Sequence, residues 1–168
     1  MTEYKQMISS KAHIAKESVL AGNVTIGDDS SVFYYSALRG DMAPVIIKRA
    51  TNIQENCVFH VDTDHPVIVG NGVTVGHGCI IHGCEIGDHS LIGMGSIVMT
   101  GAKIGKNCLI GAGSLVTQNT VIPDGMMAFG RPAKVIRPLK EKELASIYKS
   151  RDKYIEMAKN LFGDYGEK

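Results

Sequence analysis

The sequence predicts an all-β solenoid, a parallel β-helix of six-residue repeats followed by one C-terminal α-helix. Three observations predict this fold. Aliphatic residues recur every six positions, small residues recur four places after them, and the composition changes to helix-forming residues near the end of the chain. The 19 glycines and the 6% aromatic content suit many tight turns better than a large irregular core. We expect residues 1–138 to form the β-helix and residues 139–168 a helix packed on it.

The aliphatic register runs without a gap through the second half of the repeat region. Its members are Ile86, Ile92, Val98, Ile104, Ile110, Val116 and Ile122. The small residues form a second register, Ser90, Ser96, Ala102, Cys108, Ser114 and Thr120. A six-residue unit gives one strand and one turn, and three units complete a triangular coil. Both registers should therefore point inward, each buried aliphatic side chain contributing roughly 1.5–3 kcal/mol.

The first half of the chain keeps the same period with interruptions. The inward positions are Ile14, Leu20, Ile26, Val32 and Leu38, then Ile47, Ile53 and Phe59, then Val69, Val75 and Ile81. These breaks predict two insertions and one shortened repeat. After Ile122 the turn sequence Pro123-Asp124-Gly125 ends the pattern, and residues 126–138 are predicted to be an extended loop. Residues 140–162 show apolar residues at helical spacing and predict one amphipathic helix.

Charge and composition exclude several classes of partner. The 18 Lys and Arg nearly balance the 17 Asp and Glu, so neither nucleic acid nor an anionic membrane is expected. No secretory leader or membrane-spanning run is visible, which predicts a cytoplasmic chain. Its four cysteines lack paired metal-binding spacing and should be free thiols. A small neutral or weakly charged substrate fits best.

Three of the six histidines have spacing that indicates a metal site. His60 and His82 follow the inward residues Phe59 and Ile81, one full coil apart, so they should stack on one face about 4.8 Å apart. His77 lies one repeat earlier than His82 and cannot reach the same ion within its own chain, because zinc–nitrogen bonds are about 2.0–2.1 Å. A homotrimer would combine His60 and His82 with a neighbour's His77. The alternative is that all three are solvated surface residues.

Several motifs resemble those of gamma-class carbonic anhydrase-like proteins. They are Arg39-Gly40-Asp41, Asn52-Ile53-Gln54-Glu55-Asn56, His60, Val75-Gly76-His77 and Ile81-His82-Gly83. The resemblance spans about residues 10–140 and implies a left-handed β-helix, a hand that periodicity does not fix.

In that family the three matched histidines hold Zn²⁺, or another divalent ion such as Fe²⁺ or Co²⁺, at the interfaces of a homotrimer. The resemblance therefore implies reversible hydration of CO₂ to bicarbonate by metal-bound hydroxide, since such an ion lowers the pKa of bound water to about 7. It also implies that Gln54 orients that water with help from Asn52, that Arg39 and Asp41 form an interfacial charge pair, and that Tyr154 lies near the pocket. Asn52 and Gln54 could instead serve turns between repeats, and Arg39 and Asp41 a structural salt bridge.

The chain departs from the family pattern where proton transfer is concerned. Met42 follows Asp41 where active members have a glutamate, and the acidic insertion before His77 is missing. Asp62, Asp64 or His65 could substitute, although a turn role is the alternative. Two other functions stay open: a hexapeptide acyltransferase that uses acetyl-CoA or another acyl thioester, and a non-catalytic metal-binding scaffold.

Overall fold

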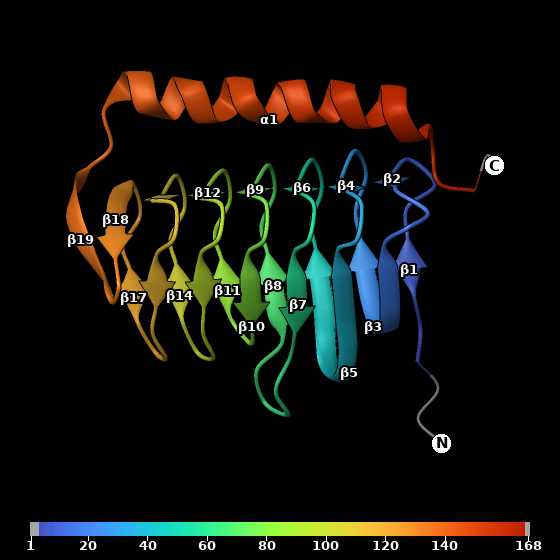
Figure 1. Ribbon diagram of the computed structural model, residues 1–168, viewed down its shortest axis with the longest axis horizontal. Coiled ribbons are helices and arrows are strands. Elements are labelled where there is room, and N and C mark those ends of the chain that lie inside the picture. Colours follow the sequence, from blue (N-terminus) through green and yellow to red (C-terminus); the bar gives the residue numbers. More distant parts are fainter. Residues whose placement is uncertain (1–3, 167–168) are drawn as a thin grey trace.

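The computed structural model describes residues 4–166, which form a triangular prism with one helix lying along it (Figure 1). The prism is a left-handed parallel β-helix, as predicted. Each coil contributes one short strand to each of three faces. Residues 1–3 and 167–168, at the ends of the two predicted segments, lie outside the described residues.

Face 1 is an eight-stranded sheet. It consists of β2 (His13–Ile14), β4 (Ser31–Val32), β6 (Asn52–Ile53), β9 (Thr74–Val75), β12 (Leu91–Ile92), β15 (Leu109–Ile110), β18 (Met126–Gly130) and β19 (Ala133–Pro138). All neighbours in this sheet pair in parallel except β18 and β19.

Faces 2 and 3 form one 11-stranded sheet, because β3 (Val19–Ile26) and β5 (Ala37–Ile47) bend from one face to the other. Face 2 is completed by β7 (Val58–His60), β10 (Ile80–His82), β13 (Ile97–Val98) and β16 (Leu115–Val116). Face 3 is completed by β1 (Met7–Ile8), β8 (Val67–Val69), β11 (Glu85–Ile86), β14 (Lys103–Ile104) and β17 (Val121–Ile122).

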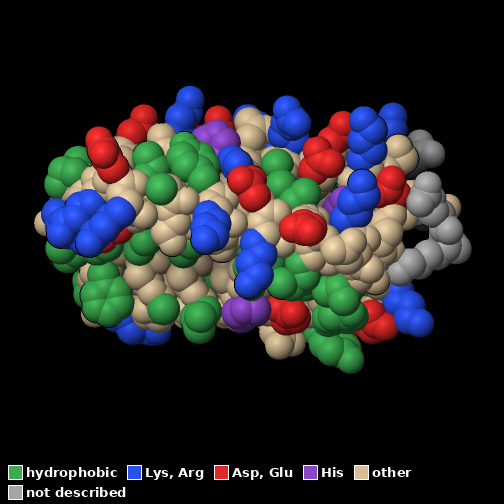
Figure 2. Space-filling view, turned by 90° about the horizontal axis from the view of Figure 1, so that it is seen from above, with side chains coloured by type: hydrophobic (Ala, Val, Ile, Leu, Met, Phe, Trp, Pro, Cys, Tyr) green, Lys and Arg blue, Asp and Glu red, His purple; other side chains and the backbone are tan. Residues whose placement is uncertain are grey.

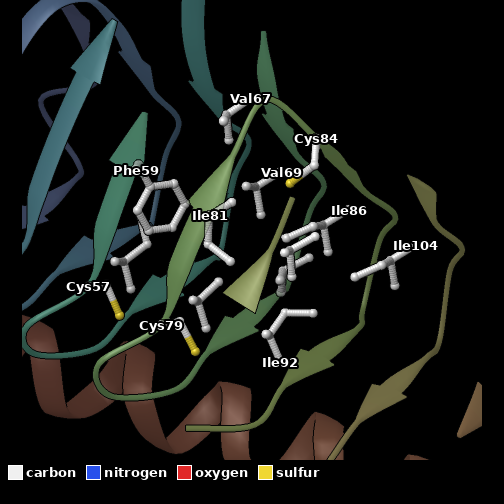
Figure 3. Close-up of a cluster of buried hydrophobic side chains, with 14 of the residues drawn as sticks. Cys57, Phe59, Val67, Val69, Cys79, Ile81, Cys84, Ile86, Ile92 and Ile104 are labelled. Atoms are coloured by element: carbon white, nitrogen blue, oxygen red, sulfur yellow. The ribbon is translucent and has the colours of Figure 1, made fainter. Parts of the chain in front are cut away.

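The core is the stack of inward residues from successive coils. Phe59 and Ile81 are fully buried register partners, and Figure 3 shows their side chains next to each other inside the prism. The register from Ile86 to Ile122 is buried throughout, as predicted, whereas Ile14 and Leu20 near the N-terminal end are half-buried. Because this core is close-packed, a change of volume at one inward position affects its neighbours in the adjacent coils.

The small residues line the corners, where they also bond to the turns. The Ser90 hydroxyl donates to the carbonyl of Gly105 at 2.8 Å, and the Cys79 thiol donates to that of Gly93 at 3.3 Å. All four cysteines are buried and unpaired, as predicted. Burial raises the pKa of Cys84 to about 12, which keeps it a thiol and favours packing over metal ligation.

The predicted interruptions of the repeat are confirmed. One insertion lengthens β5, and the other is the loop between β7 and β8, in which Asp62 and His65 exchange two backbone hydrogen bonds. The shortened repeat lies between β10 and β11, so Ile86 follows Ile81 after five residues.

The predicted extended loop at residues 126–138 is wrong, because this segment forms an antiparallel hairpin of β18 and β19. Ala128 lies six residues after Ile122, is fully buried and pairs with Ile110, so the repeat continues for one more strand. The prediction failed because the inward position of this strand is an alanine, so the six-residue pattern of larger aliphatic residues is not visible there. The chain then reverses and returns along β18.

Helix α1 (Glu141–Phe162) packs on face 1 of its own chain, near β2, β6 and β9. Its buried side chains are Ile147, Ala158 and Phe162. Phe162 packs edge-on against Phe33, with ring centroids 5.2 Å apart. Figure 2, viewed from the helix side, shows positive and negative side chains interspersed and no large patch of one sign. Within residues 4–166, no helix has the length and apolar character needed to cross a membrane.

Candidate metal centre

His60 and His82 lie side by side on face 2, as predicted. They are register partners at the ends of β7 and β10, because each follows an inward residue and therefore points outward. The imidazole centroids are 5.1 Å apart, and Nδ1 of His60 lies 3.1 Å from Nε2 of His82. Burial, followed by the charge of His60, lowers the pKa of His82, so the His82 ring is neutral near pH 7.

The spacing of these two nitrogens fits a tetrahedral metal. Two ligands with zinc–nitrogen bonds of 2.0–2.1 Å lie about 3.3 Å apart along the edge of a tetrahedron. The observed 3.1 Å separation between the His60 and His82 nitrogens is close to that edge. Neutral imidazole nitrogens are also a donor type that zinc and similar ions prefer. The pair therefore fits two positions of a divalent metal site.

Asp41, which is bonded to Arg39, contacts the ring nitrogen of His60 that does not face His82. Arg39 is the register partner of His60 one coil earlier, and its guanidinium bonds to the Asp41 carboxylate. Asp41 Oδ1 in turn lies 3.0 Å from Nε2 of His60. Burial alone would raise the pKa of Asp41, but the His60 hydrogen bond, a backbone hydrogen bond and the Arg39 charge together lower that pKa. The predicted Arg39–Asp41 pair therefore forms within one chain and orients a histidine.

His77 lies in the turn between β9 and β10. It is therefore not a register partner of His60 or His82, which pair with each other on face 2. Its side chain is 46% exposed, and Nδ1 lies 2.6 Å from Oε2 of Glu55. This contact leaves Nε2 as the ring atom available to another ligand. A carboxylate that holds the far nitrogen is the usual support for a metal-binding histidine. Within the described part of one chain, no three His, Cys, Asp or Glu residues are arranged to hold a metal.

Gln54 and Asn52 form a buried polar pair on face 1. Gln54 is 5% exposed and Asn52 is 1% exposed. Nε2 of Gln54 donates to Oδ1 of Asn52 at 3.3 Å, and Nδ2 of Asn52 donates to the Thr74 hydroxyl at 2.9 Å. Asn52 lies within strand β6, so the alternative that it serves a turn does not hold. Asn52 therefore fixes the carboxamide of Gln54.

Tyr154 packs against Phe33, with ring centroids 5.6 Å apart. Burial raises its pKa, and the negative charge of Glu55 contributes in the same direction. Tyr154 therefore lies in the small aromatic cluster between helix α1 and the prism, with Phe33 as its neighbour.

The candidates for proton transfer lie in the loop beside His82. Asp62 and Asp64 are exposed, whereas His65 is half-buried. His65 lies close enough to Gly83, the residue after His82, that a side chain at Gly83 would contact it. The loop therefore puts a histidine beside the site, with two carboxylates at its edge.

Sequence reasoning assigned no role to two residues that hold the histidines. Glu55 lies one coil before His77 and 22 residues earlier, the same offset that separates His60 from His82. Thr100 lies 18 residues after His82, and its hydroxyl is 2.9 Å from Nδ1 of His82. The length of one coil, applied to each histidine, gives the positions of both residues, and the side-chain conformation then decides whether they contact the ring.

Known families and solved structures show the fold class to which the chain belongs. Residues 83–118 match the family model "Bacterial transferase hexapeptide (six repeats)", so the chain is a hexapeptide-repeat β-helix protein. A solved structure of a Bacillus cereus protein described as a candidate acetyltransferase is 42% identical, with a TM-score of 0.93, and the match covers 95% of this chain and 93% of that chain.

Two curated relatives define the family. A Methanocaldococcus jannaschii protein named "Probable carbonic anhydrase" is 47% identical over 92% of this chain and 98% of its own length. "Gamma carbonic anhydrase 1, mitochondrial" of Arabidopsis thaliana is 38% identical over 90% of this chain and 58% of its own length. The chain belongs to the gamma-class carbonic anhydrase-like family.

Proposed function

We propose that the chain is a metal-dependent carbonic anhydrase-like lyase that interconverts CO₂ and bicarbonate at the interfaces of a homotrimer. The observation that carries this proposal is the His60–His82 pair, whose facing nitrogens are 3.1 Å apart. In each site, His60 and His82 of one chain are joined by His77 of the next. Three histidines with one open position are the donor set of a catalytic zinc site.

The metal proposed is Zn²⁺, with Fe²⁺ or Co²⁺ as alternatives for the same donors. When bound, such an ion supplies Lewis acidity that makes a water molecule reactive near neutral pH. The chain's own residues supply the remaining functions. Glu55, Thr100 and Asp41 orient the three histidines, each through one ring nitrogen. A rigid donor set reduces the reorganisation needed for binding.

Gln54 positions the reacting water in this proposal. Its carboxamide does not titrate, so it can accept or donate a hydrogen bond without competing for the proton. Asn52 holds its Nε2 group, which leaves Oε1 to accept from water. Tyr154, which packs against Phe33, is assigned to the same side of the site as Gln54. Proton transfer to solvent is assigned to His65, with Asp62 at the pocket edge, because imidazole is the side-chain group best suited to exchange protons near neutral pH.

The surface around the histidine pair supports assembly. Val58 and Ile80 precede the inward residues next to His60 and His82, and they are 46% and 42% exposed on face 2. Exposed apolar side chains that adjoin a half-formed site are typical of a subunit interface. A neighbour that covers them would also bring its His77 to the site.

The second candidate is acyl transfer, which the similarity to the Bacillus cereus protein favours. The contact between His60 and His82 argues against either ring as the base for acyl transfer, which needs a single basic histidine with a free nitrogen. His77 keeps such a nitrogen, so acetyl transfer has to be measured beside hydration.

Metal content and two activities, measured in parallel, test the proposal. We expect about one metal ion per chain and CO₂ hydration for the wild type, and loss of both for His77→Ala. His89→Ala is the matched control, because His89 packs against Tyr148 of the helix instead of the metal pair. A protein without metal that transfers acetyl groups from acetyl-CoA would overturn the proposal. Bound metal without hydration would favour a non-catalytic scaffold.

A further inference from the structure

The hairpin of β18 and β19 leaves apolar side chains exposed at one end of the prism (Figure 1). Phe129 is 55% exposed, Val135 45% and Ile136 57%. β19 is the last strand of its sheet and pairs only with β18, so its outer edge is uncovered. The proposed metal site does not use these residues, since β7 and β10 lie near the middle of the prism. Apolar side chains gathered in this way are typical of an interaction surface.

The charged residues of the same segment are all positive. Residues 126–140 include Arg131, Lys134, Arg137 and Lys140 but no Asp or Glu, although the whole chain has 18 basic and 17 acidic residues. Arg137 is neutralised by Glu143, to which it donates two hydrogen bonds of 2.7 and 2.8 Å. Within the described part of the chain, no ion pair includes Arg131 or Lys134. At the left end of Figure 2, basic side chains border apolar ones.

Several contacts hold the hairpin in one conformation. The Arg137–Glu143 pair joins β19 to the first turn of α1. At the other end of the hairpin, Arg131 Nη1 donates to the carbonyl of Gly113 at 3.2 Å. The N–H of Gly130 also donates to the Ser114 hydroxyl at 3.3 Å. A surface that is already ordered loses little conformational freedom when a partner binds to it.

The strand geometry indicates what shape of ligand the hairpin fits. β19 is extended, so a chain that follows its outer edge is extended as well. Main-chain pairing along this edge is restricted, because Ile136 has no register partner in β18 and Pro138 has no N–H to donate. Side chains must therefore supply most of the recognition.

An acidic partner fits this surface better than two other occupants do. A second copy of the chain would bring the positive segment against itself, which costs free energy. An anionic membrane is attracted only weakly by the few basic residues of one hairpin, and firm anchoring needs a further signal such as a lipid chain. An acidic and apolar segment would match the positive charge and cover the exposed apolar side chains together.

We propose that the β18–β19 hairpin binds an extended acidic segment of another protein. Carboxylates of that segment face Arg131 and Lys134, and the apolar side chains between them pack on Val135 and Ile136. The surface thus selects a chain in which acidic and apolar residues alternate. This interaction does not depend on the proposed metal site.

Fluorescence anisotropy with labelled synthetic peptides and the full-length protein tests the proposal. A peptide of alternating Glu and Val should bind, and binding should weaken as the ionic strength rises. A peptide of the same length with Gln in place of Glu should bind far less. Lys134→Glu and Ile136→Ser should each weaken binding of the acidic peptide about 5- to 10-fold. Lys153→Glu and Leu161→Ser, the same changes at exposed positions of α1, are the controls and should bind like the wild type.

Zinc content, CO₂ hydration and melting temperature should stay at wild-type values in the two hairpin variants, so a failure here is distinct from a failure of the proposed function. Equal binding of the acidic and the Gln peptide, or no binding of either, would overturn the proposal. So would wild-type affinity in Lys134→Glu. Binding to vesicles of phosphatidylserine and phosphatidylcholine that Lys134→Glu abolishes, without peptide binding, would assign the hairpin to a membrane instead. A larger oligomer that Ile136→Ser dissociates would assign it to a second copy.

Discussion

Replacing Asn52 with alanine should destabilise the fold and impair the reaction by separate routes. The change removes the acceptor of Gln54 Nε2 and the donor to the Thr74 hydroxyl. Gln54, Asn52 and Thr74 are each at most 5% exposed, so water does not readily replace the lost partners. An unpaired buried polar group costs about 1–3 kcal/mol. Since Gln54 Nε2 loses its acceptor and the Thr74 hydroxyl oxygen loses its donor, we expect a total cost of about 2–4 kcal/mol.

Urea unfolding at a fixed protein concentration measures this cost. With a slope of about 2 kcal/mol per molar urea, the midpoint should fall by about 1–2 M. Asn160→Ala, at an exposed helix position, is the control and should shift the midpoint little. CO₂ hydration should fall while zinc content is kept, because Gln54 loses its orientation and the three histidines do not. If Asn52→Ala unfolds at the midpoint of Asn160→Ala, the account of the buried pair is wrong.

Two further predictions concern carboxylates. Glu55→Gln should weaken zinc binding about 10-fold or more, because a neutral amide supports His77 less than a carboxylate does; unchanged affinity in a chelator competition would show that Glu55 is dispensable. The hydrogen bond from Arg137 lowers the pKa of Glu143 from 4.5 to about 2, so its stabilisation is full above pH 4.5 and is lost as the pH falls toward 2. Glu143→Gln should therefore melt below the wild type at pH 7, and the gap should narrow from pH 5 to pH 3; a gap independent of pH would contradict this.

The repeat made most of the fold predictable. A strict six-residue period fixes which side chains point inward, and it therefore fixed the stacking of His60 on His82 even across the four-residue insertion. The period fails where the inward residue is no longer aliphatic. Ala128 is such a residue, which is why the hairpin of β18 and β19 was taken for a loop.

The contacts around the histidines were less predictable. The repeat register predicts on which face of the prism a residue lies, but it does not predict which neighbours its side chain contacts. Asp41 contacts His60 from the insertion that bends β5. The six-residue period does not predict where residues of an insertion lie. Thr100 and Glu55 lie in neighbouring coils of His82 and His77, yet rotamers decide whether they touch them. The spacing predicted that His60 and His82 meet, and the side-chain geometry shows which residues orient them.

Complementation between two inactive variants tests the shared site most directly. His77→Ala keeps the His60–His82 pair, and His60→Ala keeps His77, so neither variant alone has a complete site. If sites form between adjacent chains, equal mixing after unfolding and reassembly should restore about one quarter of the wild-type zinc content, because one contact in four joins the two variants in the productive order. Recovery near that fraction, with CO₂ hydration in proportion, is the expected result. A mixture that binds no more zinc than its parents would contradict a site completed by the neighbour's His77.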